Sequence, residues 1–261
     1  VCASKDEEVR ALDMLGKDEE STSFLLKELE RLHVDTKNIQ IKEKVRNGKV
    51  VIILNGDQRT MFVVDPIRPV YEVDEKMQEL LNGSMYIYSL MHMIERSFSS
   101  IEPLLTAKKN GARIVLDGSS KYDDPSRVKI LYSLADGLFI NEKDYERLKA
   151  HSQREPKDII LDNGGAFVIV TKGSAGSTLY LKERTVFRES LRGLDVLDST
   201  GAGDAFAGCF LACLMKGMSY EDALSMATVN GAYACTVFGG LGGIASFEQL
   251  QAFAKEHTYD L

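Results

Sequence analysis

Hydrophobic and polar residues alternate with the period of a β-strand between residues 39 and 65. Three such runs are separated by two Asn-Gly pairs: residues 39–41, 49–54 and 59–64, with Asn47-Gly48 and Asn55-Gly56 between them. Asn-Gly favours tight hairpin turns, because both central positions of such a turn need a positive φ. The pattern predicts a small antiparallel ribbon. A ribbon of this size cannot bury a core alone, so we expect it to cover something or to pair with a partner.

From about residue 84 the pattern changes to short apolar runs that alternate with helix-like segments. The runs typical of strands are residues 85–90, 113–116, 138–140, 166–171 and 194–197. The segments typical of helices are residues 99–110, 125–133, 142–150 and 203–216, and two more that start after Ser219 and Ser246. Such alternation predicts a doubly wound, mostly parallel sheet with helices on both faces, and any ligand along one edge.

Several residues mark where the predicted helices begin and end. Gly111 and Gly217 are placed to end helices in the left-handed conformation. Ser246 is followed three residues later by Gln249, which is the pattern of a capping box. We therefore predict an α/β domain built from residues 1–36 and 66–261, and a small β domain at residues 37–65.

Composition and charge exclude several classes of protein. The 261 residues fit one large domain, and 44% hydrophobic with 27% charged residues is ordinary for a soluble globular chain. Thirty-two basic against 39 acidic residues give a net charge of −7, which argues against a nucleic-acid partner. Apolar runs are too short to span a bilayer. We predict no membrane partner and a cytoplasmic protein, in which buried reduced thiols are favoured over metal or redox roles for the four cysteines.

Candidate chemistry concentrates in the segment DSTGAGDAF, residues 198–206. Small residues open the helix that follows, so the amides of Gly201, Ala202 and Gly203 are free of bulky side chains. Helix N-termini of this kind attract phosphate through unpaired N–H groups and the helix dipole. Asp204 lies in the first turn, where a base could take a proton from a hydroxyl that attacks the bound phosphate.

The segment has two other interpretations. It could be a glycine-rich turn in which Asp204 only favours the start of the helix. It could also be a dinucleotide fingerprint, but Phe206 occupies the place of the third glycine and the segment lies near residue 200, not in a first βαβ unit. We reject the fingerprint.

The segment resembles the C-terminal signature of the ribokinase (PfkB) family of carbohydrate kinases, usually written DTTGAGDxF. Three further segments resemble family motifs in the same order along the chain. They are Leu15-Gly16-Lys17-Asp18 with Val34-Asp35 (the early GxD segment), Asn141-Glu142-Lys143-Asp144 (Asn-x-x-Glu) and Thr171-Lys172-Gly173-Ser174-Ala175-Gly176 (TxGxxG). The resemblance implies a ribokinase-like fold and an ATP-dependent transfer of phosphate to a sugar.

The same resemblance assigns roles to residues. Asp204 would be the general base, and the amides of Gly201, Ala202 and Gly203 would form the anion hole. The nucleotide would be bound by the turn that contains Thr171, Lys172, Gly173 and Gly176, together with Asn141. A simple βα turn is the alternative for residues 171–176.

Two cation sites are also implied. Asn141 and Asp144 would order Mg²⁺ through water, although Asp144 is one methylene shorter than the family's Glu and its reach is reduced. A helix cap is the alternative for this pair. Asp198 and Thr200 match positions that often hold a monovalent cation such as K⁺, completed by backbone carbonyls near Ala234, Val237 and Gly239.

Sugar recognition has weaker signals. Glu95 resembles a carboxylate that some family members place near the substrate, and a solvated acid is an equal alternative. Asp117-x-Ser119-x-Lys121 resembles an Asp-x-Asn-x-Arg motif, in which Lys121 could meet an acidic substrate. The family's first-strand Asp and its Gly-Gly segment are not found in this sequence, so we expect about forty residues, the size of a βαβ piece, to be missing from it.

Residues 37–65 match the family's lid, which excludes water from the reaction, and paired lids would make a homodimer. We expect a kinase that phosphorylates a hydroxyl of a small sugar with Mg-ATP. A nucleoside kinase of the same fold and a catalytically idle sugar- or nucleotide-sensing homologue are the alternatives.

Overall fold

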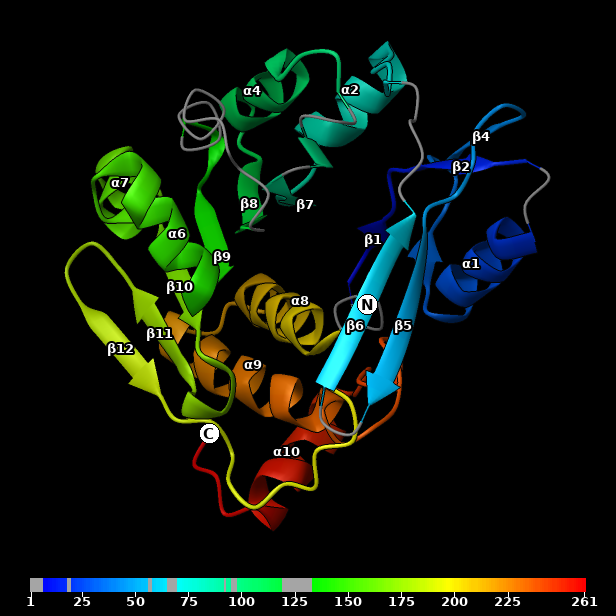
Figure 1. Cartoon of the computed structure of the whole chain (residues 1–261). Coiled ribbons are helices and arrows are strands. Elements are labelled where there is room, and N and C mark those ends of the chain that lie inside the picture. The colour runs from blue at the N-terminus through cyan, green and yellow to red at the C-terminus, as the bar shows by residue number, and fades with distance from the viewer. Residues whose placement is uncertain are drawn as a thin grey trace.

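The computed structural model of the chain describes residues 7–17, 20–55, 58–64, 70–91, 93–94, 98–118 and 133–261. Its centre is a six-stranded sheet with the strand order β12-β11-β10-β9-β8-β7 (Figure 1). The strands are β7 (Tyr86–Leu90), β8 (Arg113–Gly118), β9 (Gly137–Asn141), β10 (Phe167–Thr171), β11 (Ser177–Tyr180) and β12 (Thr185–Arg188). Strands β7 to β10 are parallel, and β11 and β12 continue the sheet in antiparallel pairing. The predicted, mostly parallel sheet is confirmed.

Helices cover both faces of this sheet, because its strands are apolar on both sides. One core contains Ile114 and Leu116 of β8, with residues of α4 (Glu102–Lys109), α6 (Glu142–Ser152) and α7 (Pro156–Asp162). The other core contains Val115 of β8, with residues of α8 (Ala202–Met215), α9 (Tyr220–Ala234) and α10 (Phe247–Glu256). The side chains of each strand alternate between the two cores, as a pleated sheet buried on both faces requires.

The predicted helix ends are confirmed in detail. Ser219 accepts a hydrogen bond from the backbone N–H of Asp222, and Ser246 forms a complete capping box with Gln249. Gly111 and Gly217 have φ angles of +102° and +78°, which glycine adopts with little strain. These caps fix where α4, α8, α9 and α10 begin or end.

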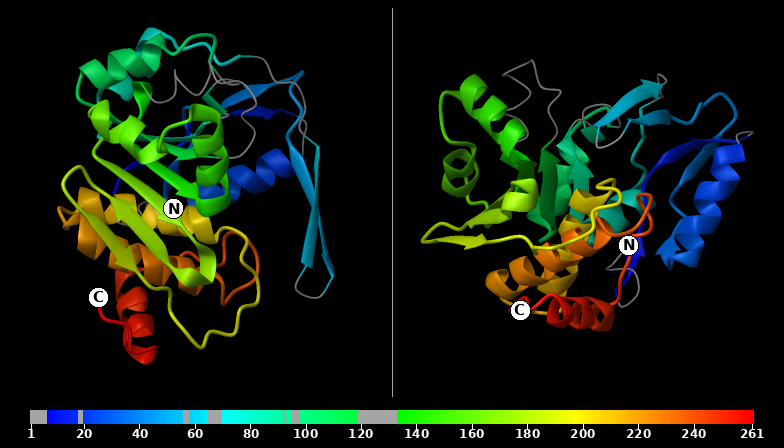
Figure 2. Two further views of the ribbon diagram at one scale, coloured as in Figure 1. Left: turned by 60° about the vertical axis from the view of Figure 1, so that its left-hand side comes forward. Right: turned by 60° about the horizontal axis from the view of Figure 1, so that its bottom comes forward.

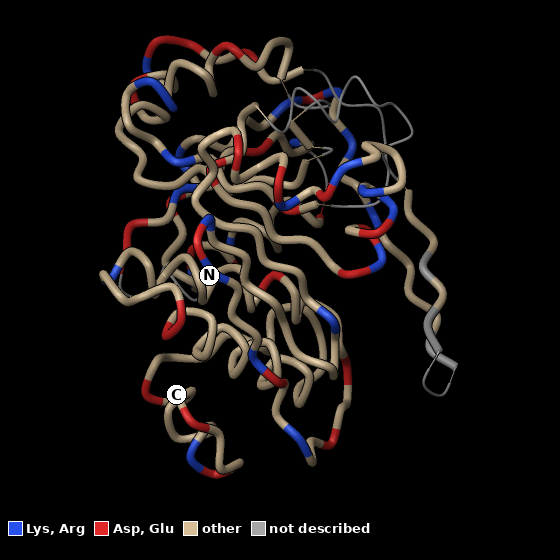
Figure 3. The backbone as a smooth tube through the Cα atoms, turned by 90° about the vertical axis from the view of Figure 1, so that its left-hand side faces the viewer, with Lys and Arg blue, Asp and Glu red and all other residues tan. Residues whose placement is uncertain are grey.

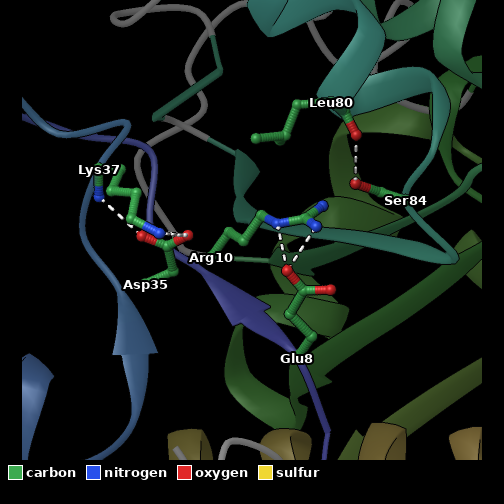
Figure 4. Close-up of polar contacts among 6 residues, drawn as sticks. All are labelled: Glu8, Arg10, Asp35, Lys37, Leu80 and Ser84. Atoms are coloured by element: carbon green, nitrogen blue, oxygen red, sulfur yellow. Dashed lines mark hydrogen bonds and ion pairs between the residues drawn. The ribbon is translucent and has the colours of Figure 1, made fainter.

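The N-terminal part forms two small parallel pairs beside α1 (Glu20–Arg31). β1 (Val9–Arg10) pairs with β3 (Val34–Asp35), and β2 (Met14–Gly16) pairs with β4 (Gln40–Lys42). Figure 4 shows local polar contacts here: Arg10 pairs with Glu8, and Lys37 pairs with Asp35. In the same view Ser84 donates to the carbonyl oxygen of Leu80, at the end of α2 (Glu75–Asn82), which packs against α4.

The ribbon, formed by β5 (Lys49–Asn55) and β6 (Gln58–Val64), is antiparallel and extends away from the rest of the chain (Figure 2). Asn55 pairs with Gln58, so the hairpin predicted at Asn55-Gly56 is confirmed for the two strands. The hairpin predicted at Asn47-Gly48 is wrong, because β4 pairs with β2 and not with β5.

Asn47 shows the physical reason for this error. Its side chain is buried, accepts a hydrogen bond from the backbone N–H of Gly16 at 2.9 Å and donates to the hydroxyl groups of Ser21 and Thr22. A buried amide with three partners stabilises the base of the ribbon against α1. The residue therefore serves a distant contact and not a local turn.

Both faces of the ribbon present apolar side chains to solvent. These side chains are 39–59% exposed, and they belong to Val50, Val51, Ile52, Ile53, Phe62, Val63 and Val64. Isolated apolar residues on a surface are normal, but a contiguous set on one ribbon marks an interaction site or an edge that requires cover.

Two other expectations differ from the structure. The strand predicted at residues 194–197 is wrong: the segment is irregular, and Leu197 donates its backbone N–H to the carbonyl oxygen of Cys235. The helix predicted at 125–133 falls almost wholly outside the described residues. The antiparallel strands β11 and β12 were not predicted.

Charged residues of both signs are interspersed along the backbone (Figure 3). Within the described ranges, no helix combines the length and the apolar character that crossing a bilayer requires. Cys209, Cys213 and Cys235 are free thiols.

Candidate active site

Helix α8 begins from a turn that the loop after α9 holds in place. Gly201 precedes the helix with a φ of +80°, and a Cβ atom there would lie 2.9 Å from backbone atoms of Gly240. Asp198 accepts a hydrogen bond from the backbone N–H of Thr200 at 2.9 Å and another from Gly239 at 3.0 Å. The carboxylate of Asp198 thus ties the turn to the loop that follows α9.

The turn leaves backbone N–H groups available at the start of α8. Neither Gly201 nor Gly203 has an acceptor for its N–H among the described residues, whereas Ala202 donates to the carbonyl oxygen of Ser199 at 3.3 Å. Gly203 is exposed, and a Cβ atom on it would meet nothing within 4 Å. Such unpaired N–H groups at the positive end of a helix dipole form an anion-binding site. The N–H groups of Gly201 and Gly203 are available, as predicted. The N–H of Ala202 differs, because it already makes a long hydrogen bond within the turn.

Asp204 lies in the first turn of α8, with its side chain open to solvent. Nearby protein still removes enough water to raise the pKa of its carboxyl above the ordinary value. A carboxylate with increased proton affinity beside an anion site is suited to act as a base.

A second acid, Asp117, lies close to Asp204. Asp117 is near the end of β8, and Tyr88 of β7 donates its hydroxyl to the carboxylate at 2.9 Å. Burial raises the pKa of Asp117 to about 6, and the negative charges of Asp204 and Asp144 add to the increase against the opposing hydrogen bond from Tyr88. Burial and the charge of Asp117 also raise the pKa of Tyr88.

In the sequence Asp117 is recognisable only as part of the Asp-x-Ser-x-Lys motif, and Tyr88 carries no motif. The available signal was position, because the end of a parallel strand on the face covered by α8 is where a site residue is expected.

Asn141 and Asp144 form a closed pair at the start of α6. Asn141 accepts from the backbone N–H of Asp144 at 2.9 Å, and its side-chain amide donates to the carboxylate of Asp144 at 2.6 Å. Asp144 is buried. The helix-cap interpretation of this pair is confirmed, and the same geometry leaves Asn141 exposed at the sheet edge.

The turn after β10 is the second glycine-bearing segment at this edge. Thr171 pairs with Asn141 on one side and Ser177 on the other. Lys172 lies 3.7 Å from Glu142, and its backbone N–H donates to the carbonyl oxygen of Gly176. The turn therefore places one cationic side chain near Asn141.

The two glycines of this turn differ. Gly176 has a φ of +106°, and a Cβ atom there would lie 2.1 Å from the carbonyl oxygen of Arg188, so β12 itself requires glycine. Gly173 has a φ of +56° and faces open space. Only Gly173 leaves room for a ligand beside its backbone.

Residues 141, 144 and 171 thus lie at one edge of the sheet, and the charges of Asp144 and Asp204 both act on Asp117 at the end of β8. The register of β8, β9 and β10 aligns Gly118 with Ile140 and Thr171 with Asn141. Glu95 and Lys121 lie outside the described residues. The described ranges contain no group of three or more His, Cys, Asp or Glu side chains that could hold a metal ion directly.

Comparisons with known proteins identify the family. Residues 3–244 match the family described as pfkB family carbohydrate kinase. The chain is 25% identical over 260 residues to the ATP-dependent 6-phosphofructokinase of Thermoanaerobacterium thermosaccharolyticum, covering 95% of this chain and 77% of that protein. It is 24% identical over 238 residues to the ribokinase of Staphylococcus aureus, covering 87% and 76%.

Solved structures show the same fold. The fructokinase of Xylella fastidiosa with bound ATP superposes with a TM-score of 0.85 at 18% identity, covering 98% of this chain and 88% of that one. The ribokinase of Arabidopsis thaliana complexed with ribose and ATP gives 0.81 at 21%, covering 97% and 84%. A further similar structure, from E. coli, contains ATP and Mg²⁺ and gives 0.80 at 19%, covering 98% and 86%. With its ribokinase-like fold and a family match over nearly its whole length, the chain belongs to the pfkB family of carbohydrate kinases.

Proposed function

We propose that the start of α8 binds the phosphoryl group that passes from ATP to a hydroxyl of a small sugar or sugar derivative, and that Asp204 is the general base. The observation that carries this proposal is the pair of N–H groups at Gly201 and Gly203, which have no acceptor among the described residues, in the same turn as the exposed carboxylate of Asp204, whose pKa is raised. Phosphoryl transfer depends mainly on positioning and on stabilising charge, which these groups can supply.

In the proposed reaction, the hydroxyl oxygen of the acceptor forms a bond to the γ-phosphorus while the bond from that phosphorus to the bridging oxygen of ADP breaks. The hydroxyl proton goes to Asp204. The amides of Gly201 and Gly203, assisted by Ala202, donate hydrogen bonds to the oxygens on which charge develops. Removing water from this site strengthens each of these interactions.

The nucleotide is proposed to lie along the turn after β10. Lys172 and the open backbone at Gly173 support contacts to its phosphates, together with Thr171 and Asn141, whereas Gly176 supports the shape of the turn. Asn141 and Asp144 fit a Mg²⁺ ion held through water, because Asn141 donates to only one oxygen of the Asp144 carboxylate and the other has no hydrogen-bond partner among the described residues. The ion would neutralise phosphate charge when bound.

A monovalent cation such as K⁺ is proposed beside Asp198 and Thr200. Both carboxylate oxygens of Asp198 accept backbone N–H groups, so its charge would act together with backbone carbonyls of the adjoining loop near Ala234, Val237 and Gly239. Replacing K⁺ by tetramethylammonium, which is too large for such a loop, is expected to lower the rate of ADP formation. An unchanged rate would contradict this site.

We further propose that residues 37–65 act as a lid and that two ribbons pair into a homodimer, since their apolar faces are exposed. Ile52→Lys is then expected to shift the sedimentation of the protein from dimer to monomer, while Lys49→Ala at the base of the ribbon leaves it unchanged. A wild-type monomer would contradict the dimer. Glu95 and Lys121 stay predictions for sugar binding, and the free thiols favour a cytoplasmic location.

The test is ADP formation by the complete protein with a panel of sugars, sugar phosphates, sugar acids and nucleosides. Turnover with a sugar, and a fall of about 10³-fold or more in Asp204→Ala with ATP binding retained, would support the proposal. Turnover with nucleosides alone would support the nucleoside kinase. Binding of sugar or ATP without turnover in any case would support a sensing homologue.

A further inference from the structure

Three polar side chains, those of Tyr88, Asp117 and Asn141, lie on the face of the sheet that α8 covers. On β8, Asp117 comes two residues after Val115, so both point to the same face, and Val115 is fully buried in the core beneath α8. In the sheet register Asp117 is paired with Leu90 of β7 and with Phe139 of β9. Asp117 is therefore the first polar position above an apolar floor, between Tyr88 and Asn141.

Tyr88 is held in place by aromatic packing. Its ring meets Phe139 edge-on with ring centroids 6.3 Å apart, and Phe139 meets Phe206 of α8 in the same way at 6.2 Å. Phe206 lies two residues after Asp204. The orientation of the phenol is thereby coupled to the first turn of α8, and its hydroxyl fixes one oxygen of the Asp117 carboxylate.

Stability alone does not explain a carboxylate at position 117. Asp204 and Asp144 bring like charges near it, and among the described residues no Lys or Arg pairs with it. A neutral Asn could accept the Tyr88 hydroxyl without these costs. The second carboxylate oxygen has no hydrogen-bond partner in the described part of the chain. A partly buried carboxylate with like charges nearby and no cationic partner among the described residues, placed beside a reaction site, indicates that Asp117 binds a ligand.

We propose that the second oxygen of Asp117 accepts a hydrogen bond from a further hydroxyl of the acceptor, while Asp204 takes the proton of the reacting hydroxyl. This inference rests on the proposed function. It makes Asp117 a specificity-determining residue and Tyr88 the positioning residue that orients it. The substrate class is a polyhydroxy sugar that presents two hydroxyl groups to two carboxylates, and acceptors without the second hydroxyl are discriminated against.

The test removes the hydroxyl and the charge in turn. The best sugar from the panel and its single-deoxy analogues are compared by kcat/KM in the wild type, Asp117→Asn and Tyr88→Phe. The analogue that lacks the reacting hydroxyl is set aside. For one of the other analogues, the kcat/KM of the wild type is expected to be about 10- to 100-fold lower than for the parent sugar, as for the loss of a hydrogen bond to a charged group. In Asp117→Asn the loss is expected to shrink below about 3-fold, with Tyr88→Phe between the two.

Tyr86→Phe is the matched control, because Tyr86 lies on the same face of the same strand and contacts Arg113, not Asp117. It should discriminate like the wild type. If every analogue loses the same factor in Asp117→Asn as in the wild type, the inference is wrong. A changed Mg²⁺ requirement without changed discrimination would also overturn it, since Asp117 would then serve the metal. Absence of turnover in the wild type would instead defeat the proposed function, and this inference with it.

Discussion

Two glycine-bearing turns border the candidate site, and they differ in what their backbones leave available. In the turn after β10, the N–H groups of Lys172, Ala175 and Gly176 donate to carbonyl oxygens within the turn. In the turn before α8, the N–H groups of Gly201 and Gly203 have no acceptor among the residues that the structure describes. The turn after β10 therefore supplies the cationic side chain of Lys172 and a backbone with its own hydrogen bonds. The turn before α8 supplies backbone hydrogen-bond donors.

Each turn also contains one glycine that the protein's own packing requires and one that it does not. Gly176 faces the backbone of Arg188 and Gly201 faces that of Gly240, whereas Gly173 and Gly203 face open space. The glycines of one motif therefore have different roles. Gly176 and Gly201 allow the turns to form, and Gly173 and Gly203 leave space for a ligand beside the backbone.

The largest effect on stability is expected at Gly176. In Gly176→Ala the new methyl group would collide with the carbonyl oxygen of Arg188, and the φ of +106° is strained for alanine. Thermal and urea unfolding should show a loss of at least about 3 kcal/mol. Gly173→Ala, at a φ of +56° with open space, should lose only about 1 kcal/mol. Equal losses would remove the distinction between the two glycines.

The next effect separates activity from stability within α8. Gly203→Ala places a methyl group where the transferred phosphate is proposed to bind, so kcat/KM for ATP is expected to fall about 10- to 100-fold, or about 1.4 to 2.8 kcal/mol. Its stability should not fall, because alanine favours helices. Gly208→Ala, in the same helix and also facing open space, is the control and should keep full activity. Full activity in Gly203→Ala would argue against anion binding at this turn.

A smaller effect tests the excess negative charge near the α8 turn. The folded protein raises the pKa of Asp117 to about 6 from an ordinary 3.8, so stability falls as pH rises between about 4 and 6. Asp117→Asn removes this loss and should be more stable than the wild type by about 1 to 2 kcal/mol at pH 8. The two unfolding curves should converge near pH 4. A constant difference across this range would show that the charge of Asp117 is not the cause.

The smallest effect concerns the side chain of Lys172 in the turn after β10. The Lys172–Glu142 pair is partly exposed, so Lys172→Ala should change stability by less than about 1 kcal/mol. If Lys172 contacts the nucleotide, KM for ATP should rise about 3- to 10-fold, as expected for the loss of one partly exposed charged contact. Glu142→Gln breaks the same pair but keeps the lysine, and its KM should stay at the wild-type value. A matching rise in both variants would assign the effect to the pair itself.

Local signals predicted much of the architecture. The capping box at Ser246 and the glycine at 217 act within a few residues, so their structural meaning can be inferred without knowing the fold. The same holds for the start of α8, where small residues and Asp204 follow one another directly. Strand and helix alternation was enough to predict the parallel part of the sheet.

Features that depend on distant partners were not predicted. Asn47 resembled a hairpin residue, but it binds Gly16, Ser21 and Thr22 across the fold. Tyr88 and Asp117 lie on different strands, and only the register of β7 and β8 brings them together. Residues 194–197 resembled a strand, but the segment is irregular, and Leu197 donates its backbone N–H to the carbonyl oxygen of Cys235.

The most direct measurement of the central claim follows the amide signals of the two turns by ¹H–¹⁵N NMR. The complete protein would be observed with and without MgADP, fluoroaluminate and the acceptor sugar, which together mimic the transferred phosphoryl group. We predict large downfield shifts at Gly201 and Gly203, and a much smaller one at Gly208. Unchanged signals at Gly201 and Gly203, with shifts confined to Gly173 and Gly176, would contradict the account.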